Sequence, residues 1–167
     1  MFVNNIERDK DFDFAKELYL VRRRLEKRIA KQQINGFYVC SLSFESIIYK
    51  GLFLAEQLSI FYPDLANEEF ISSFAVFHQR YSTNTFPSWG LAQPFRLLAH
   101  NGEINTISGN TNWMRNHQTR ITTEIFGDDS EQVKPIIEKN VSDSSALDAA
   151  FEPVSYTHLT LPTNREV

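Results

Sequence analysis

The sequence LAQPFRLLAHNGEINT, residues 91–106, decides how the rest of the chain is interpreted. Residues 95–100 are rich in apolar side chains and predict a strand, and Asn101-Gly102 directly behind them is a strong turn signal. A helix is predicted from about Asn105 to His117, with Trp113 and Met114 on its inner side. A strand, a tight turn and a helix in succession are typical of an α+β domain.

Further elements are predicted on both sides of this stretch. Asp13 is a reasonable N-cap for a helix with an apolar stripe made of Ala15, Leu18, Val21, Leu25 and Ile29. Three more strands are predicted at 37–42, 47–50 and 72–81, the first two as a hairpin, and two more helices at 54–62 and 143–151.

The other face of the first helix carries a run of basic residues: Arg22, Arg23, Arg24, Lys27, Arg28 and Lys31. One interpretation is a patch for nucleic acid or an acidic partner. The other is an ordinary solvated helix face, with cations near the helix C-terminus where the macrodipole favours them. The solvated face is the preferred interpretation.

The composition is that of a soluble globular protein. The chain has 167 residues, of which 42% are apolar and 23% charged, and fourteen Phe residues suggest a sheet-rich core. A net charge of −4 argues against a nucleic-acid partner, and no apolar run approaches the ~18 residues that span a bilayer. The single cysteine, Cys40, excludes an internal disulfide and fits a reducing compartment, so a cytoplasmic location is expected.

Three short segments carry residues suited to binding a free amino acid. Arg80, at the end of a predicted strand, offers a planar fork for a carboxylate. Asn101 and Gly102 can aim a side-chain amide and a backbone N–H at one point, as in an oxyanion hole. Asp143 can accept hydrogen bonds from an ammonium group.

Each of these residues also has a simpler interpretation. Asn-Gly is first of all a hairpin turn, Arg80 could pair with a surface acid, and Asp143 could be only a helix cap. His78 and His100 lie close to these segments, but no Asp or Glu spacing supports a metal site, and none is expected.

Longer stretches resemble the glutaminase domain of glutamate synthases, a class II glutamine amidotransferase. The resemblance covers roughly 37–152 and includes Tyr49-Lys50-Gly51, Gln79-Arg80-Tyr81-Ser82-Thr83-Asn84-Thr85 and the Ser142-Asp143-Ser144 segment. Its most specific parts are the runs 91–95 and 101–106, because other class II amidotransferases share only the Arg and Asn-Gly cores.

The resemblance implies a partial αββα sandwich of the N-terminal-nucleophile hydrolase type, with 1–152 as an incomplete amidotransferase domain. By resemblance, Arg80 holds the α-carboxylate of glutamine, Asp143 holds its α-ammonium, and Asn101 and Gly102 stabilise the oxyanion. In that family the nucleophile is a cysteine at the mature N-terminus, whose own α-amine, with a pKa near ~8, acts as the base.

The departure from the family pattern is that this chain begins Met1-Phe-Val, without the nucleophilic cysteine. Cys40 lies inside a predicted strand without a free amine and is interpreted as a small buried residue. The chain alone is therefore expected to be inactive. By resemblance, the parent enzyme transfers ammonia to 2-oxoglutarate and uses FMN and an iron–sulfur cluster. The resemblance also implies the remaining domains and a small subunit as partners, and no cofactor is expected in this chain.

The last residues, 153–167, are expected to be a non-native tail. VSYTHLTLPT, residues 154–163, resembles a translated sequencing adapter, so His158 is excluded from the site. Two other hypotheses stay open for the chain as a whole. It could be a non-catalytic module that binds an amino acid or regulates a partner, or it could belong to another class II amidotransferase.

Overall fold

The computed structural model describes residues 11–79, 88–100 and 104–156, with side chains from residue 14. Five α-helices lie in these ranges: α1 (Asp11–Lys31), α2 (Leu58–Phe61), α3 (Ile107–Phe126), α4 (Ser130–Val133) and α5 (Asp143–Ser155). Short 3-10 turns lie at η2 (Ala55–Gln57), η3 (Pro63–Ala66), η4 (Trp89–Leu91) and η5 (Gly127–Asp129).

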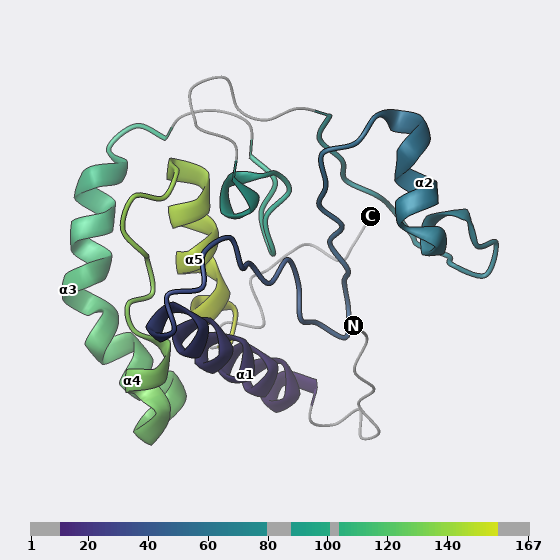
Figure 1. Cartoon of the computed structure of the whole chain (residues 1–167). Helices are drawn as coiled ribbons and strands as arrows, with labels where there is room; N and C mark the ends of the chain where they lie inside the picture. The colour runs from purple at the N-terminus through teal and green to yellow at the C-terminus, as the bar shows by residue number, and fades with distance from the viewer. Residues whose placement is uncertain (1–10, 80–87, 101–103, 157–167) are drawn as a thin grey trace, which may run out of the picture.

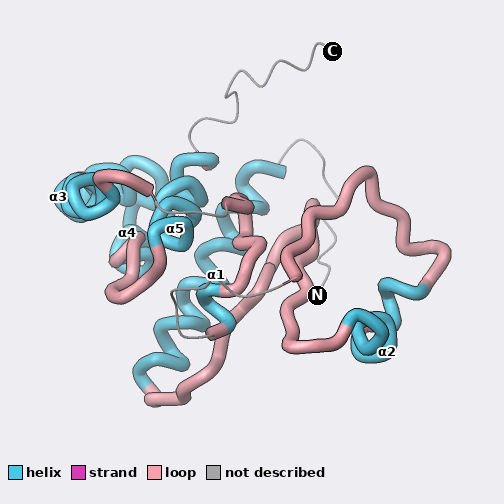
Figure 2. Tube along the Cα trace, turned by 90° about the horizontal axis from the view of Figure 1, so that it is seen from above, coloured by secondary structure: helices cyan, strands magenta, loops and turns pink. Residues whose placement is uncertain are grey.

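Four of these helices form one packed body, and α2 lies apart from it (Figure 1). Helix α4 contacts both α1 and α3, and α5 packs beside α3. The main contacts of α2 are with its neighbours η2 and η3, and Figure 2 shows it on a long loop at the side of the helical body. No helix of the described residues is long and apolar enough to cross a membrane.

The helical body has two small apolar cores. In the first, Tyr19 and Leu20 of α1 pack on Phe126 and Val133, and the rings of Tyr19 and Phe126 stack at 5.4 Å. The second lies between α3 and α5 and consists of Ile136, Ile137 and Ala146 with partly buried residues around them, among them Ile107, Met114, Ile121 and Val141. The chain can turn from α3 into α4 because Gly127 adopts φ +52°, a conformation that a side chain disfavours.

The interpretation of the basic face of α1 as solvated is wrong for Arg22 and Arg23. Both side chains are buried, whereas Val21 and Leu25, predicted to face the core, are exposed. Arg22 donates to Glu152 of α5 at 2.5 Å, and Arg23 donates to the backbone carbonyl of Pro135 at 2.7 Å. Guanidinium groups can be buried in this way when carboxylates and carbonyls satisfy most of their donors, and here Arg23 Nε is the exception, without a partner among the described residues. Helical periodicity alone did not reveal this buried face.

Glu26 is the centre of the buried ion pairs. Its carboxylate binds Arg22 at 2.9 Å and Arg23 at 3.0 Å on its own helix, and Arg96 of the 95–98 loop at 3.1 Å. Burial opposes the charged form of Glu26, but the nearby arginines outweigh it and hold the pKa of this carboxyl below its usual value. Glu26 is therefore an anion that binds α1 to the 95–98 loop.

The predicted strands at 37–42, 47–50, 72–81 and 95–100 are not formed in the described residues, which contain helices, turns and loops only. In the predicted hairpin, the Ile48 N–H donates to Ser41 Oγ at 3.1 Å, and Ser43 Oγ accepts from the Glu45 N–H. Side-chain oxygens thus take the place of backbone carbonyls as acceptors. Hydrogen bonds of this kind compete with the backbone hydrogen bonds that would pair two strands.

The 95–100 segment departs from a strand for a similar reason. The Phe95 N–H donates to the Leu98 carbonyl at 2.9 Å, which closes a tight loop, and the Leu97 and Leu98 N–H groups donate to Asp148 of α5. An extended strand cannot make these bonds. The residues of the predicted 72–81 strand that are described include Phe74 and Phe77, both 78% exposed, so these two rings are largely uncovered in the described structure.

The predicted helices are confirmed, with changed bounds. The first begins at Asp11, so Asp13 lies inside it and the prediction of Asp13 as its N-cap is wrong. The helix predicted from about 105 to 117 runs from Ile107 to Phe126, and the one predicted at 54–62 is the pair η2 and α2. Helix α5 continues across the expected tail boundary at 153 to Ser155. Pro153 is fully buried, and the Tyr156 ring lies 5.5 Å from Tyr19.

We expect Glu26→Gln to lower the free energy of unfolding by about 3 kcal/mol at pH 7, because it leaves buried arginines short of a carboxylate. Urea unfolding followed by circular dichroism measures this, with Glu17→Gln on the exposed side of α1 as the matched control. Since the folded-state pKa of Glu26 is lowered, its contribution is present above the pKa of the unfolded chain and is lost as pH falls through the folded pKa. Equal stabilities of the two variants at pH 7 would contradict the buried network.

Ending the chain after Glu152 removes Pro153 and the Tyr156 ring that packs on Tyr19 and Phe126. We expect a loss of about 3 kcal/mol in unfolding free energy, the usual cost of removing a packed aromatic side chain. A chain that ends after Tyr156 keeps these contacts and is the control. If both shortened chains unfold at the same urea concentration, the packing of Tyr156 contributes nothing.

Candidate functional site

The predicted site residues fall into two groups. Arg80, Asn101 and Gly102 lie outside the described residues, so their predicted roles stay predictions. Asp143 is described, and so are the residues that flank the Asn-Gly pair, up to His100 and from Ile104. The site can therefore be built from α5 and the two flanks of this pair.

Asp143 is the first residue of α5, and its carboxylate contacts the chain just after the Asn-Gly pair. Ser142 caps the helix, because its Oγ accepts from the Ser145 N–H at 3.2 Å. The Asp143 side chain is thus not the cap, and its Oδ2 accepts from the Ile104 N–H at 3.0 Å. A carboxylate at a helix N-terminus is also favoured by the macrodipole.

His100, directly before the pair, is held by two polar side chains. Gln93 donates through Nε2 to the His100 carbonyl at 2.6 Å and accepts from the His100 N–H at 3.5 Å. Ser144 of α5 contacts the same residue: its Oγ lies 3.0 Å from His100 Nδ1 and donates to the His100 carbonyl at 3.3 Å. His100 is thus held in place by hydrogen bonds to Gln93 and Ser144.

Asp148, one turn further along α5, binds the loop before His100. One carboxylate oxygen, Oδ1, accepts from the Leu97 N–H at 2.8 Å and the Leu98 N–H at 2.9 Å. The side chain is buried, so these bonds replace water entirely. Asp143, Ser144 and Asp148 together bind both flanks of the Asn-Gly pair to one helix.

A polar pocket of about 300 Å³ lies against Asp143, between the first turns of α3 and α5 and the 137–142 loop. It contains charges of both signs, with Arg115 from α3 and Glu138 and Asp143 on the other walls. Hydroxyl groups of Ser108 and Thr111 add neutral donors and acceptors. This lining can bind a small polar molecule.

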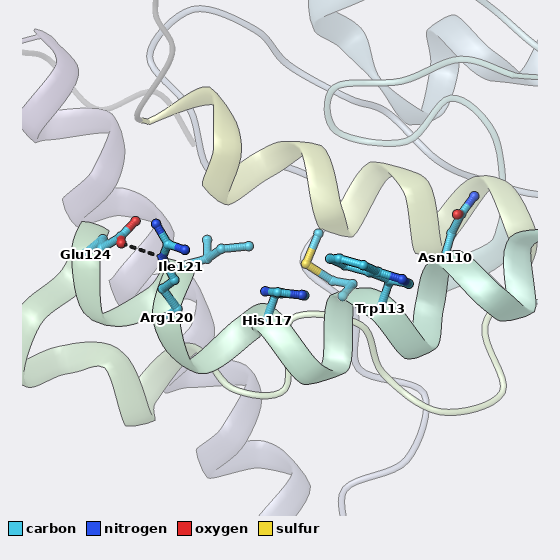
Figure 3. A pocket seen from close by; sticks show the side chains of 7 residues that line it. Asn110, Trp113, His117, Arg120, Ile121 and Glu124 are labelled. Carbon is cyan, nitrogen blue, oxygen red and sulfur yellow. Dashed lines mark hydrogen bonds and ion pairs between the residues drawn. The ribbon is translucent and has the colours of Figure 1, made fainter.

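A second, more apolar groove runs along α3 (Figure 3). Trp113 and His117 stack there at 4.3 Å with an angle of 12° between their planes, and Arg120 pairs with Glu124 at 2.9 Å. The prediction that Trp113 lies on the inner side of its helix is wrong, since it is 68% exposed, whereas Met114 packs on the second core. Neighbouring residues of a helix point about 100° apart, so only one of this pair can face the core.

Lys50 holds the turn that leads to Gln93. Its Nζ donates to the carbonyls of Trp89 at 3.1 Å and Ala92 at 2.7 Å, and lies 4.7 Å from the ring centre of Tyr38. Burial lowers the pKa of Lys50 to about 8. A neutral amine still has two N–H donors for the two carbonyls, so the turn stays bound in either charge state.

Metal ligands do not gather in the described residues: no group of three or more His, Cys, Asp or Glu side chains is placed to hold an ion there. Cys40 is a free, half-buried thiol. It lies in a loop, not in the strand that was predicted.

Sequence reasoning missed Gln93, Lys50, Arg115 and Asp148. For Asp148 a signal existed, because an acid inside the apolar run Ala146-Leu147-Asp148-Ala149-Ala150 is unlike a solvated helix face. Gln93 and Lys50 form hydrogen bonds with backbone atoms of neighbouring loops. The path of a loop cannot be predicted from the spacing of apolar residues, so these bonds could not be predicted either.

Comparison with known proteins gives a consistent result. Residues 1–164 match the family described as glutamine amidotransferases class-II. The chain is 56% identical over 162 residues to the glutamate synthase (NADPH) large chain of Azospirillum brasilense, covering 97% of this chain and 11% of that protein. It is 47% identical over 142 residues to the corresponding large chain of Bacillus subtilis (strain 168), covering 85% and 9%.

A ferredoxin-dependent, chloroplastic glutamate synthase of Spinacia oleracea is 45% identical over 153 residues, covering 91% of this chain and 9% of that protein. The chain therefore spans about a tenth of the length of these relatives.

Asp148→Asn is expected to loosen the loop before His100, because an amide directs N–H groups at backbone donors. We expect a loss of about 2–3 kcal/mol in unfolding free energy and faster amide hydrogen exchange at Leu97 and Leu98. The exposed Asp128→Asn is the matched control. Unchanged exchange at both amides would show that Asp148 does not hold the loop.

Proposed function

Because the chain belongs to the class-II glutamine amidotransferase family, we propose that it is part of the glutamine-hydrolysing domain of a glutamate synthase and binds glutamine. Arg80 holds the α-carboxylate and Asp143 the α-ammonium, while Asn101 and Gly102 are the donors for the tetrahedral oxyanion. In the parent enzyme, glutamine is hydrolysed to glutamate and ammonia, and the ammonia is transferred reductively to 2-oxoglutarate.

The observation that carries this proposal is the hydrogen bond between Asp143 and the Ile104 N–H at 3.0 Å. It puts the acid beside the segment that follows the Asn-Gly pair, and Ser144 binds the residue that precedes the pair. Asp143, which is proposed to hold the ammonium group, is therefore expected close to the oxyanion donors. One glutamine molecule requires this, because its α-ammonium and its side-chain carbonyl are only a few bonds apart.

The isolated chain is proposed to bind glutamine without hydrolysing it. Cys40 is its single cysteine, and an internal residue has no free α-amine to take the thiol proton. Oxyanion donors lower the barrier only after a nucleophile has attacked the carbonyl. Binding and turnover are thus separable in this chain.

The parent's fold is proposed to be the αββα sandwich of N-terminal-nucleophile hydrolases, with 1–152 as part of it and 153–167 as a non-native tail. Support for the sandwich comes from residues 52–77, where Leu52, Ile71 and Phe74 are each more than three-quarters exposed. These exposed apolar side chains could pack on the face of a sheet if neighbouring strands supplied hydrogen-bond partners for the backbone of this segment.

The parent's cofactors, FMN and an iron–sulfur cluster, are proposed to bind outside this chain. Iron–sulfur clusters are held mainly by several cysteine thiolates, and this sequence has one cysteine. The remaining domains and a small subunit are proposed partners, and the cytoplasm is the proposed location. The net charge of −4 supports the proposal that nucleic acid is not a partner.

Calorimetry with L-glutamine on the 167-residue chain tests the binding half of this proposal. Arg80→Ala is expected to weaken binding at least tenfold, because a charge-assisted pair with the carboxylate is lost. Arg28→Ala, at an exposed arginine of α1, is the control. An enzymatic ammonia assay tests the other half: steady ammonia release by the pure chain would refute the inactivity, and unaltered binding by Arg80→Ala would refute the role of Arg80.

A further inference from the structure

The groove along α3 is a surface that the proposed function does not use. Every side chain that lines it belongs to α3, and Figure 3 shows these side chains along one face of the helix. Helix α3 lies at the outer edge of the helical body in Figure 1, so another molecule can reach this face. We call the seven lining residues the α3 stripe: Asn110, Trp113, Met114, His117, Arg120, Ile121 and Glu124.

Trp113 is the apolar anchor of the α3 stripe. Of the large apolar side chains of α3 it is the most exposed, at 68%. Its ring stacks on His117 at 4.3 Å, which favours one orientation of the indole. Met114 and Ile121 are partly buried against the second core and add apolar surface beside the ring. An exposed Trp that is held by a neighbouring ring is typical of the centre of a protein–protein interface.

The residue types along the α3 stripe make it complementary to itself. If two copies of α3 pack antiparallel about a two-fold axis at His117, each residue faces the one equally far from His117 on the other side. Trp113 then faces Ile121 of the second copy, and both side chains are apolar. Asn110 faces Glu124 of the second copy, so an amide donor meets a carboxylate. Any helical stripe is symmetric in spacing, but only a suitable order of residue types gives favourable pairs.

The charges of the stripe favour the antiparallel arrangement over the parallel one. Arg120 pairs with Glu124 of its own helix at 2.9 Å and, in the antiparallel pair, faces Met114 of the second copy. The two Arg120 side chains then lie six residues apart along the helix axes, or about 9 Å. In a parallel pair each of these charges would face its own copy, and facing like charges are unfavourable.

We propose that the α3 stripe binds the α3 stripe of a second copy of this chain, antiparallel, about a two-fold axis at His117. Such a contact is isologous, so it closes as a dimer and contains the pair of Trp113 with Ile121 twice. From Asn110 to Glu124 the stripe is about 21 Å long. This interface is small, and the dimer is therefore weak and dependent on protein concentration. The dimer is independent of glutamine binding.

Sedimentation equilibrium of the 167-residue chain measures this association. The apparent mass is expected to rise from that of a monomer toward that of a dimer as the protein concentration increases. Trp113→Ala is expected to raise the dissociation constant at least tenfold, because the anchor is lost. Ala is the strongest helix former, so this variant keeps α3, and circular dichroism verifies this. Thr119→Ala, at an exposed position on another face of α3, is the control and leaves the constant unchanged.

Disulfide cross-linking tests the two-fold axis. In a Cys40→Ser background, His117→Cys puts one thiol of each copy on the axis, where the two can reach disulfide distance. Oxidised glutathione is expected to convert this variant to a covalent dimer at least tenfold faster than Thr119→Cys in the same background. Equal rates for the two variants would overturn the axis at His117.

Residues 52–77, with exposed apolar side chains such as Leu52 and Phe74, are the competing surface for self-association. The variant with both Leu52→Ser and Phe74→Ser distinguishes the two surfaces. Loss of association in Trp113→Ala, with preferential cross-linking at position 117, supports the α3 stripe. Association that this double variant abolishes and Trp113→Ala leaves unchanged overturns it. A chain that stays monomeric up to about 1 mM also overturns it.

Discussion

The Glu26 carboxylate is the constraint on which the helical body depends. It binds arginines of α1 and of the 95–98 loop, and Arg22 continues the network to Glu152 near the end of α5. Buried ion pairs add little net stability, because desolvation offsets most of their attraction. Breaking one is costly, however, so the network fixes which arrangement of α1, α5 and the loop is allowed.

The position of α5 is the link between that network and the site. Glu152 binds one end of the helix to α1, while Asp143, Ser144 and Asp148 at its other end bind residues on both sides of the Asn-Gly pair. A helix is stiff over three turns, so a shift at Glu152 would move the acceptors that hold the loop. Polar groups buried for structural reasons thus also set the geometry at the site.

The sequence predicted helices well and strands poorly, for a physical reason. A helix satisfies its backbone groups within one segment, so local sequence sufficed to predict that α1 and α5 are helices, although Asp13 lies inside α1 and Val21 and Leu25 of its apolar stripe are exposed. A strand needs a second strand in register, and at 95–98 the Asp148 carboxylate takes the N–H groups instead. Burial of Arg22 and Arg23 was equally hidden, because their partners lie more than a hundred residues away.

For the predicted site, the structure describes only the surroundings of Asp143, because residues 80, 101 and 102 lie outside the described ranges. Residue types at 80, 101, 102 and 143 predict an amino acid as ligand, but they leave open whether Asp143 is only a helix cap, and the structure gives that position to Ser142. Because Ser142 caps α5, the Asp143 carboxylate can turn to Ile104 and keep one oxygen for a ligand.

The described part of the chain divides into a half with its own core and a half without one. Helices α1, α3, α4 and α5 enclose two apolar clusters and the arginine network. Residues 47–70 are held mainly by ring contacts, such as Tyr49 with Tyr62 at 4.6 Å, and by the Tyr62 hydroxyl on the Lys50 carbonyl. Asp143 lies in the half with a core. Packed helices therefore set its position beside residue 104, and this position depends on no strand within the described residues.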